Sequence, residues 1–373
     1  MEKKIIFHIP FFVDEKRKSG SHIRPLKMLN AFKNFGYSVD CVTGYGKERK
    51  KSIAQIKKNI EKGINYEFCY SESSTMPTLL TEKNHIPKYF NLDFNFFKYL
   101  KDKNIPIGLF YRDCYWAFPN YQDGVSKLKK AVSKKFYLSD LKNYNKFVDI
   151  LYLPNKKMND YLPLPFKKTI KELPPGIDEH DDMEKQTEFS DFKNKKLKLF
   201  YVGGLSFLYD LKLLVETVSC DDRIELTICT RQNEWEGVKD DYLPIMNENI
   251  KVIHKSGSEF KEDIENSNIC ILYFKPSEYR KFAMPVKLFE YMSYEKPILA
   301  TKGSSVGDFV EKNKMGFSID YEKEELKNTL NEILSNPSLL KERVENIRNI
   351  KIKNTWSYRA KTVAKDLTER KKL

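Results

Sequence analysis

Cysteine is scarce in this sequence and follows no spacing pattern. The chain has 373 residues and 6 cysteines, and no two cysteines form a C-x-x-C pair. Structural zinc sites and the disulfide frameworks of small secreted proteins both depend on closely spaced cysteines. We therefore expect neither, and the scattered thiols indicate a reducing compartment such as the cytoplasm.

Long hydrophobic runs are also missing. Residues 269–274 form one of the longest, far short of the roughly 20 apolar residues that cross a bilayer. Near the N-terminus two lysines precede the apolar residues 5–13, as in a signal peptide. The charged residues 14–17 follow, however, without a small-residue cleavage site. We predict a buried first strand there and no membrane-spanning segment.

Clustered metal ligands are absent from the sequence as well. The five histidines are far apart, and the acidic cluster at residues 178–182 falls in a predicted linker. Metal sites in proteins gather three or four such side chains at short spacings. We therefore predict no metal and no cofactor, and we also expect no Ser-His-Asp hydrolase.

Positive charge is what the sequence has in excess. Lys and Arg number 66 against 52 Asp and Glu, which gives a formal net charge of +14. Such a balance favours anionic partners, among them nucleic acid, acidic lipid and phosphate-bearing small molecules. The lysines are spread through every region, and there is no arginine-rich tract or RNA-binding aromatic motif. We predict no nucleic-acid partner.

The first half of the chain alternates between strand and helix patterns. An apolar stretch at residues 3–10 is followed by a glycine-bearing loop at 19–21 and by helical spacing at 26–32. A second strand is expected at residues 39–44, and later strands at 107–110 and 150–153. This alternation predicts an α/β domain with a parallel sheet.

The same pattern begins again after a turn-rich segment at residues 172–178. The expected strands and helices are, in order, strand 197–202, helix 211–218, strands 224–229, 252–253, 269–274, 297–300 and 316–319, and helices from residue 324. A chain of this length usually forms two cores. We predict domains at residues 1–176 and 177–352, followed by a C-terminal helix at 353–373.

The most informative local motif is the segment 282–301, which reads FAMPVKLFEYMSYEKPILAT. It resembles the donor-site segment of retaining glycosyltransferases of the GT-B fold, family four (group 1), which often reads K-L-x-E-Y-x-x-x-x-K-P-[IV]-[IL]-[AG]. The matching residues are Lys287, Leu288, Glu290, Tyr291, Lys296 and Pro297. The resemblance implies an α/β GT-B fold, in which two Rossmann-like domains face each other across a cleft and a C-terminal helix crosses back to the first.

Glu290 and Lys287 are the strongest site candidates. A carboxylate on a helix can accept hydrogen bonds from both ribose hydroxyls of a nucleotide, which is the role we predict for Glu290. The helix is expected to start after Pro285, so that its first amides and Lys287 face a diphosphate. The alternative is a surface Lys/Glu pair at i, i+3.

One position departs from the family pattern. Many members carry another glutamate eight positions before the ribose-binding one, where this chain has Phe282. Glu278 lies four positions earlier still. The departure affects the expected contact with the hydroxyls of the donor sugar. We expect the donor to be a UDP-sugar.

The resemblance assigns further donor-binding residues, more weakly. Gly203 and Gly204 follow a predicted strand, and their bare backbone would let the nucleotide-sugar approach. Arg231 stands where the family has a basic residue that neutralises the diphosphate, although an ordinary loop arginine is the alternative. Ser304 and Ser305 precede the residues that the resemblance places near the phosphates. Residues 173–178 resemble the family's P-x-G-[IV]-D hinge, and 354–357 its terminal helix.

The N-terminal half contributes two candidate segments. Residues 19–25 resemble the family's glycine loop near the donor phosphate and the acceptor, with Gly20 as a donor-binding and Arg24 as an acceptor-binding candidate. Arg112 and Asp113 follow a predicted strand, and catalytic groups gather at the carboxyl ends of parallel strands. They would position or deprotonate the acceptor hydroxyl, while Tyr115 and Trp116 form a platform for a sugar ring. The alternative is a buried Arg–Asp ion pair beside aromatic packing.

Residues 125–138 have the pattern of a basic amphipathic helix. Its apolar side carries Val125, Leu128, Val132 and Phe136, and lysines surround it at positions 127, 129, 130, 134 and 135. Such a helix can lie on an anionic membrane. The alternative is a solvated face over an ordinary core stripe.

Together these features predict a retaining hexosyltransferase. It would move a sugar from a nucleotide-diphosphate sugar to a hydroxyl of a glycan or lipid-linked acceptor in bacterial surface polysaccharide or glycolipid synthesis. Asp113, Arg112, Arg231 and Lys287 would be its catalytic residues. The expected location is the cytoplasm, with peripheral binding to the inner face of the cell membrane. A nucleotide-sugar epimerase of the same fold and a non-catalytic membrane-associated scaffold are the alternatives.

Overall fold

The computed structural model describes residues 3–14, 20–118, 126–178, 195–206 and 208–371. The chain divides into two compact units. Residues Met1–Pro175 with Trp356–Leu373 form the N-terminal unit, and Gly176–Thr355 form the C-terminal unit. The divisions lie next to the boundaries expected from the sequence. Ser19, Val125 and the acidic residues 179–184 lie outside the described residues.

A six-stranded parallel sheet, in the order β2-β1-β3-β4-β5-β6, is the centre of the N-terminal unit. Three of the four inner strands contain short apolar runs, and helices bury the sheet on both faces, as parallel strands require. The strands are β1 (Lys4–His8), β2 (Ser38–Val42), β3 (Cys69–Glu72), β4 (Ile107–Phe110), β5 (Ile150–Leu153) and β6 (Thr169–Glu172).

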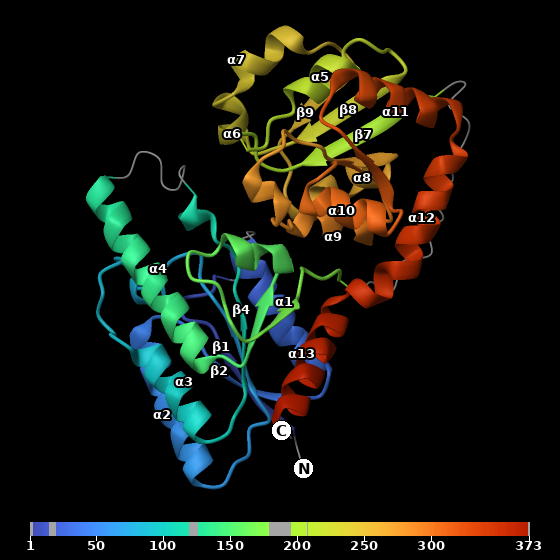
Figure 1. The fold of residues 1–373 in the computed structure, drawn as a ribbon. Coiled ribbons are helices and arrows are strands. Elements are labelled where there is room, and N and C mark those ends of the chain that lie inside the picture. The colour runs from blue at the N-terminus through green and yellow to red at the C-terminus, as the bar shows by residue number, and fades with distance from the viewer. Residues whose placement is uncertain (1–2, 15–19, 119–125, 179–194, 207, 372–373) are drawn as a thin grey trace. The chain divides into compact units, whose positions relative to one another are not determined.

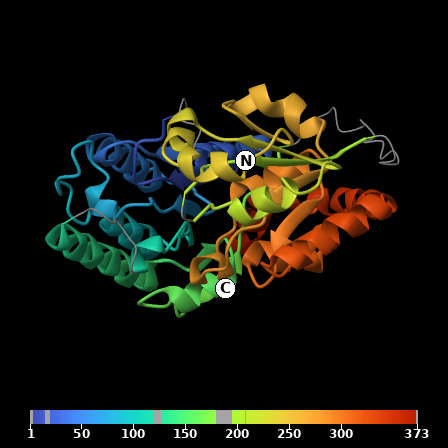
Figure 2. The same ribbon diagram turned by 90° about the horizontal axis from the view of Figure 1, so that it is seen from above.

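Helices from both ends of the sequence cover this sheet (Figure 1). They are α1 (Gly20–Asn34), α2 (Gly46–Glu61), α3 (Leu92–Asp102), α4 (Lys127–Phe147) and α13 (Trp356–Lys371). Helices α2, α3 and α4 pack in a row (Figures 1 and 2), whereas α1 packs against α13 (Figure 1). Leu367 of α13 lies against Gly108 of β4, where an added Cβ would come within 2.9 Å of the leucine. The last helix is therefore part of the first unit's core.

The N-terminal unit differs from the predicted pattern in three places. Strands β3 and β6 have no counterpart in the prediction, because each has four residues and their sequences, CYSE and TIKE, lack an apolar run. Helix α1 begins at Gly20. Residues 21–25, which were expected to belong largely to a loop, are therefore helical.

The C-terminal unit also has a six-stranded parallel sheet, in the order β12-β11-β10-β7-β8-β9. Its strands are β7 (Leu197–Val202), β8 (Ile224–Cys229), β9 (Ile250–Ile253), β10 (Ile269–Leu272), β11 (Ile298–Thr301) and β12 (Gly316–Ile319). These strands follow the predicted pattern. With strands counted along the chain, the order corresponds to that of a Rossmann sheet, with β7 and β10 adjacent at its centre.

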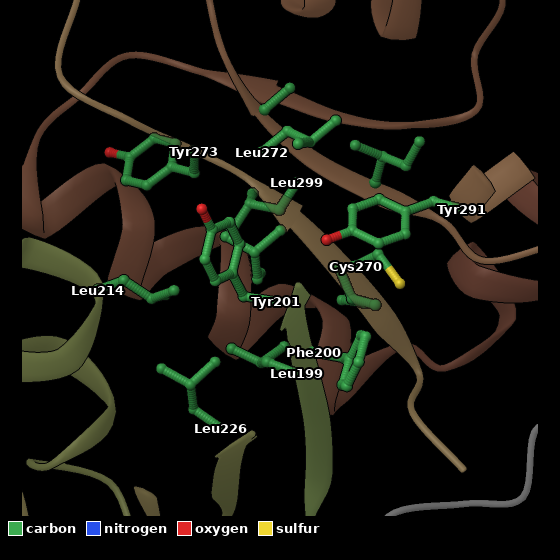
Figure 3. Close-up of a cluster of buried hydrophobic side chains, with 14 of the residues drawn as sticks. Leu199, Phe200, Tyr201, Leu214, Leu226, Cys270, Leu272, Tyr273, Tyr291 and Leu299 are labelled. Carbon is green, nitrogen blue, oxygen red and sulfur yellow. The ribbon is translucent and has the colours of Figure 1, made fainter. Parts of the chain in front are cut away.

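Helices flank the second sheet on both faces (Figure 1). They are α5 (Lys212–Val218), α6 (Gln232–Glu236), α7 (Lys239–Tyr242), α8 (Lys261–Glu265), α9 (Val286–Ser293), α10 (Ser305–Lys312), α11 (Lys323–Ser335) and α12 (Ser338–Lys351). Tyr201 and Tyr291 lie among the leucines of the core between sheet and helices (Figure 3). The Tyr291 hydroxyl accepts a hydrogen bond of 3.0 Å from the amide of Val202. This bond ties α9 to the end of β7.

Candidate functional site

The candidate site lies at the carboxyl edge of the C-terminal unit's sheet. β7 and β10 are neighbours there, and the order of strands reverses between them. In open parallel sheets, ligands bind beyond the strand ends at such a switch point. Gly203 follows β7, Arg231 follows β8, and a short 3₁₀ helix, Glu278–Lys281, follows β10 and leads to α9.

Helix α9 presents Lys287 and Glu290 on one side. Pro285 is the N-cap, as predicted, and its missing amide hydrogen costs nothing at a helix start. Leu288, Phe289, Tyr291 and Met292 are buried in the core, and Lys287 and Glu290 are partly buried at i, i+3 spacing. The apolar residues fix the rotation of the helix, so that the two charged side chains share one face.

Aromatic rings and the glycine loop surround Lys287. Its Nζ lies 5.1 Å from the ring centroid of Tyr201 and 5.2 Å from that of Tyr209. A Cβ added to Gly203 would come within 1.6 Å of Nζ. Any side chain at position 203 would displace the ammonium group from this place.

The ammonium of Lys287 has no close counter-ion. Among the described residues, no carboxylate forms an ion pair or hydrogen bond with it. Burial lowers the pKa of Lys287 to about 8, although the charges of Glu290 and Glu234 act in the opposite direction. A partly buried cation without a carboxylate partner is suited to bind an anion.

The Glu290 carboxylate is likewise uncommitted. No described residue donates a hydrogen bond to it, and burial raises its pKa. The charge of Lys287 lowers that pKa, and Asp178 of the predicted hinge raises it. Both oxygens are therefore available to accept hydrogen bonds from a pair of ligand hydroxyls.

Arg231 and Gly204 lie beside a glutamate that the prediction did not include. Arg231 is the N-cap of α6, and its Nη1 lies 3.0 Å from Glu234 Oε1. The Arg231 side chain is 70% exposed. A Cβ at Gly204 would come within 3.1 Å of Glu234 Oε2. The sequence predicts that Arg231 neutralises a diphosphate, but Glu234 already offsets part of its positive charge.

Ser304 and Ser305 serve the turn before α10. The Ser304 hydroxyl donates to the carbonyl of Thr301 at 2.6 Å and accepts from the amide of Gly307 at 2.9 Å. Ser305 is buried, with 1% of its surface exposed. The sequence predicts that both side chains contact the donor. The Ser304 hydroxyl is instead used in capping the helix, and the Ser305 side chain is enclosed.

Residues 303–307 also spell G-S-S-V-G, which fits the G-x-S-x-G pattern of a hydrolase nucleophile. The segment connects β11 to α10, the context in which such a motif occurs. An elbow of this kind exposes its serine, whereas Ser305 is buried. The burial argues against a serine nucleophile at this turn.

The remaining motif residues are structural. Lys296 is buried, and its Nζ donates to the carbonyl oxygens of Glu265 and Ser267 at 2.7 and 2.8 Å. Glu295 pairs with Arg348 and Lys351 of α12 at 2.6 and 3.0 Å. The K-P part of the motif thus holds the turn after α9 in place.

In the N-terminal unit, two predicted site arginines point at a buried carboxylate. Arg112 Nη2 lies 2.9 Å and Arg24 Nε 3.3 Å from Glu72, which is fully buried at the end of β3. Arg24 is 2% exposed and stacks 3.5 Å from the centroid of Phe110. The acceptor contact expected of Arg24 is therefore wrong in this structure, since its side chain is enclosed. Arg112 pairs with Glu72, and the charges of both Glu72 and Asp113 raise its pKa against the effect of burial.

Trp116, one of the two residues of the predicted sugar platform, is packed inside this unit, whereas Tyr115 is partly exposed. Trp116 is 4% exposed, stacks on Tyr137 at 4.5 Å, and donates to the Tyr111 hydroxyl at 2.9 Å. Its ring therefore cannot present a face to a sugar. Asp113 Oδ1 accepts the amide of Tyr115 at 3.0 Å, which stabilises the turn after β4.

Arg280 lies close to the same tyrosine as Lys287, and the sequence did not indicate it. It lies in the 3₁₀ helix before α9, with its guanidinium carbon 4.2 Å from the Phe274 centroid and 5.3 Å from that of Tyr209. The surrounding letters, S-E-Y-R-K, read as a charged surface loop. Only the fold brings Arg280 and Lys287 to the same tyrosine.

Neither a metal cluster nor a membrane helix occurs in the part of the chain that the structure describes. No three His, Cys, Asp or Glu side chains there are grouped so as to hold a metal ion. No described helix has both the length and the apolar composition needed to cross a bilayer.

The arrangement of Lys287, Glu290 and the glycine loop can be compared with known proteins. Residues 182–350, nearly the whole C-terminal unit, match the family model described as glycosyl transferases group 1. This confirms the family that the 282–301 motif indicated. No curated protein sequence matches the chain.

Solved structures extend the likeness to both units. Sucrose-phosphate synthase from Thermosynechococcus elongatus is 12% identical, with 99% of each chain covered and a TM-score of 0.61. A glycosyltransferase from Rickettsia africae is 14% identical, with 99% of each covered and a TM-score of 0.61. Anabaena HepE, in complex with UDP and glucose, is 12% identical, with 97% of this chain and 99% of that chain covered and a TM-score of 0.60. These structures confirm the GT-B fold.

Proposed function

We propose that this chain transfers a hexose from a nucleotide-diphosphate sugar to a hydroxyl of a glycan or lipid-linked acceptor, with retention at the anomeric carbon. The observation that carries the proposal is the pair Lys287 and Glu290, uncommitted to other described residues, beside the glycine loop of a group 1 unit. HepE, which shares the fold, was crystallised with UDP and glucose, and this supports a UDP-sugar as donor.

Each site group has a defined task in the proposed reaction. Glu290 accepts the two ribose hydroxyls and orients the nucleotide. Lys287 stabilises the negative charge that develops on the diphosphate as the bond between the anomeric carbon and the phosphate oxygen breaks. The acceptor oxygen bonds to that carbon from the same face, and its proton passes to a phosphate oxygen. Because charge on the leaving group grows toward the transition state, a cation there accelerates the step.

A nucleotide screen tests the proposal. UDP, GDP, ADP, CMP and TDP are compared by thermal shift with the wild type, with Glu290→Ala, and with Glu324→Ala, a matched variant at an exposed position of α11. We expect one nucleoside diphosphate to stabilise the wild type and Glu324→Ala, and Glu290→Ala to lose most of that stabilisation. No response to any of the five would contradict a donor site. A donor sugar epimerised in the absence of acceptor would indicate the epimerase instead.

We also propose that α4 places the enzyme on the inner face of the cell membrane. Leu128 is 76% and Val132 41% exposed. The side of α4 that faces the core carries Tyr137, Leu141 and Tyr144 instead. A core stripe through Leu128 and Val132 is therefore wrong. Lysines flank the exposed apolar pair, a combination that favours anionic lipid.

A further inference from the structure

Two partly buried cations, Lys287 and Arg280, meet at the end of β7 and β10. Both lie near the Tyr209 ring, whose centroid is 5.2 Å from Lys287 Nζ and 5.3 Å from the guanidinium carbon of Arg280. Among the described residues, neither cation has a carboxylate within ion-pair distance. Burying one positive charge without a counter-ion is unfavourable, and burying two side by side is more so.

The Arg280 side chain is fixed in place. Its guanidinium lies over Phe274 at 4.2 Å, and Nη2 donates to the carbonyl oxygen of Leu208. Guanidinium carries five N–H donors, and this is the one hydrogen bond that the described residues provide. The aromatic contact and the carbonyl hold the group, while its other donors remain for a ligand.

Electrostatics supports the same view of the pair. Burial lowers the pKa of Arg280 and of Lys287, and the charge of Arg280 is among the effects that lower the pKa of Lys287. The two groups therefore repel each other in the ligand-free protein. An anion with charge on two neighbouring groups would relieve this repulsion and satisfy the free donors of both side chains.

We propose that Arg280 and Lys287 together bind the two phosphates of a nucleoside diphosphate, and that Arg280 makes the site select diphosphates over monophosphates. This inference rests on the proposed donor site and adds a residue that lies before the 282–301 motif. Glu290 holds the ribose, so the phosphates extend from it toward Lys287 on the same helix face. Arg231 is a weaker candidate for this task, because it is exposed and paired with Glu234.

Calorimetric titration of the full chain with UDP, UMP and inorganic pyrophosphate tests the inference. The variants are Arg280→Gln, Arg280→Lys and the control Lys281→Gln, whose side chain is exposed and pairs with Glu278. We expect Arg280→Gln to weaken UDP and pyrophosphate binding by about 10-fold to 100-fold, the range for a lost charged hydrogen bond. UMP affinity should change less than about 2-fold. Arg280→Lys should recover part of the loss, and Lys281→Gln should bind as the wild type does.

The outcomes separate this inference from the donor site itself. Equal UDP affinity in the wild type and Arg280→Gln would overturn the role of Arg280 and leave the donor site intact. Equal losses for UDP and UMP would overturn it as well, since they would indicate a structural effect. If the wild type binds pyrophosphate through Arg280 but no nucleotide, the cation pair stands as an anion site and the donor site fails. If the wild type binds neither, both proposals fail.

Discussion

Lys287 is a lysine among aromatic rings, and its protonation state should control binding of the donor. Burial lowers its pKa from the ordinary 10.5 to about 8. The side chain loses its charge as the pH rises through that value, so UDP affinity should fall above about pH 8 by up to roughly tenfold per pH unit. Calorimetric titration from about pH 7 to about pH 9 measures this.

Lys287→Arg is the control for that profile, because arginine keeps its charge throughout the range. The difference between the two profiles isolates the lysine from any titration of the nucleotide. Coincident profiles would contradict the assignment.

The stability of the protein should depend on pH in the opposite direction to UDP affinity. Between about pH 8 and 10.5 the unfolded chain holds the proton that the folded chain releases. The contribution of Lys287 to the free energy of unfolding therefore rises with pH in this window.

The sequence predicted some site residues and missed others for a physical reason. Glu290 and Lys287 could be proposed from the sequence because both stand in a linear motif on one helix. Arg280 was missed because its role arises from contact with Tyr209, 71 positions earlier in the sequence. Arg24 and Trp116 were misassigned because a polar or aromatic residue after a strand has the same sequence pattern whether it faces a ligand or packs inside.

At the scale of elements, α13 completes the core of the N-terminal unit. Leu367 is fully buried against β4. Leu367→Ala should lower the free energy of unfolding by about 2–5 kcal/mol, the usual cost of a buried leucine cavity. Leu243→Ala, at a position 55% exposed, is the matched control and should stay within about 0.5 kcal/mol. Denaturant titration followed by circular dichroism measures both, and equal stabilities would show that α13 is not part of this core.

Elements were predictable where the local pattern was strong. The strands of the C-terminal unit are apolar runs of four to six residues bounded by turns, and they occur where expected. Strands β3 and β6 are half polar and became recognisable only by pairing with neighbours, Cys69 with Ile107 and Ile150 with Thr169. The sequence left two orientations of α4 open, because Leu128 and Val132 have helical spacing whether they are buried or exposed; in the structure both are exposed.

At the scale of the whole molecule, the net charge of +14 should favour binding to anionic membranes, with α4 as the contact surface. Sedimentation with phosphatidylglycerol vesicles should retain the wild type, whereas phosphatidylcholine vesicles should not. The double variant Leu128→Glu, Val132→Glu should bind the anionic vesicles at least about tenfold more weakly, because it removes apolar contact and adds negative charge. High salt should release the wild type.

Leu243→Glu is the matched control for the vesicle experiment, since it places the same charge at an exposed leucine of the C-terminal unit. It should bind vesicles nearly as the wild type does. Equal binding of the double variant, or equal binding to both lipids, would contradict a membrane role for α4.

The placing of α13 also bears on the order in which the protein acquires its structure during synthesis. Ribosomes make the N-terminal side of a chain first, yet the partner of α1 lies after the entire C-terminal unit. The N-terminal unit therefore completes its core only after residues 356–371 have been synthesised, and until then part of its apolar surface stays uncovered. The C-terminal unit, whose residues are contiguous, can close its core first. The donor-binding half would thus mature before the half that precedes it in the gene.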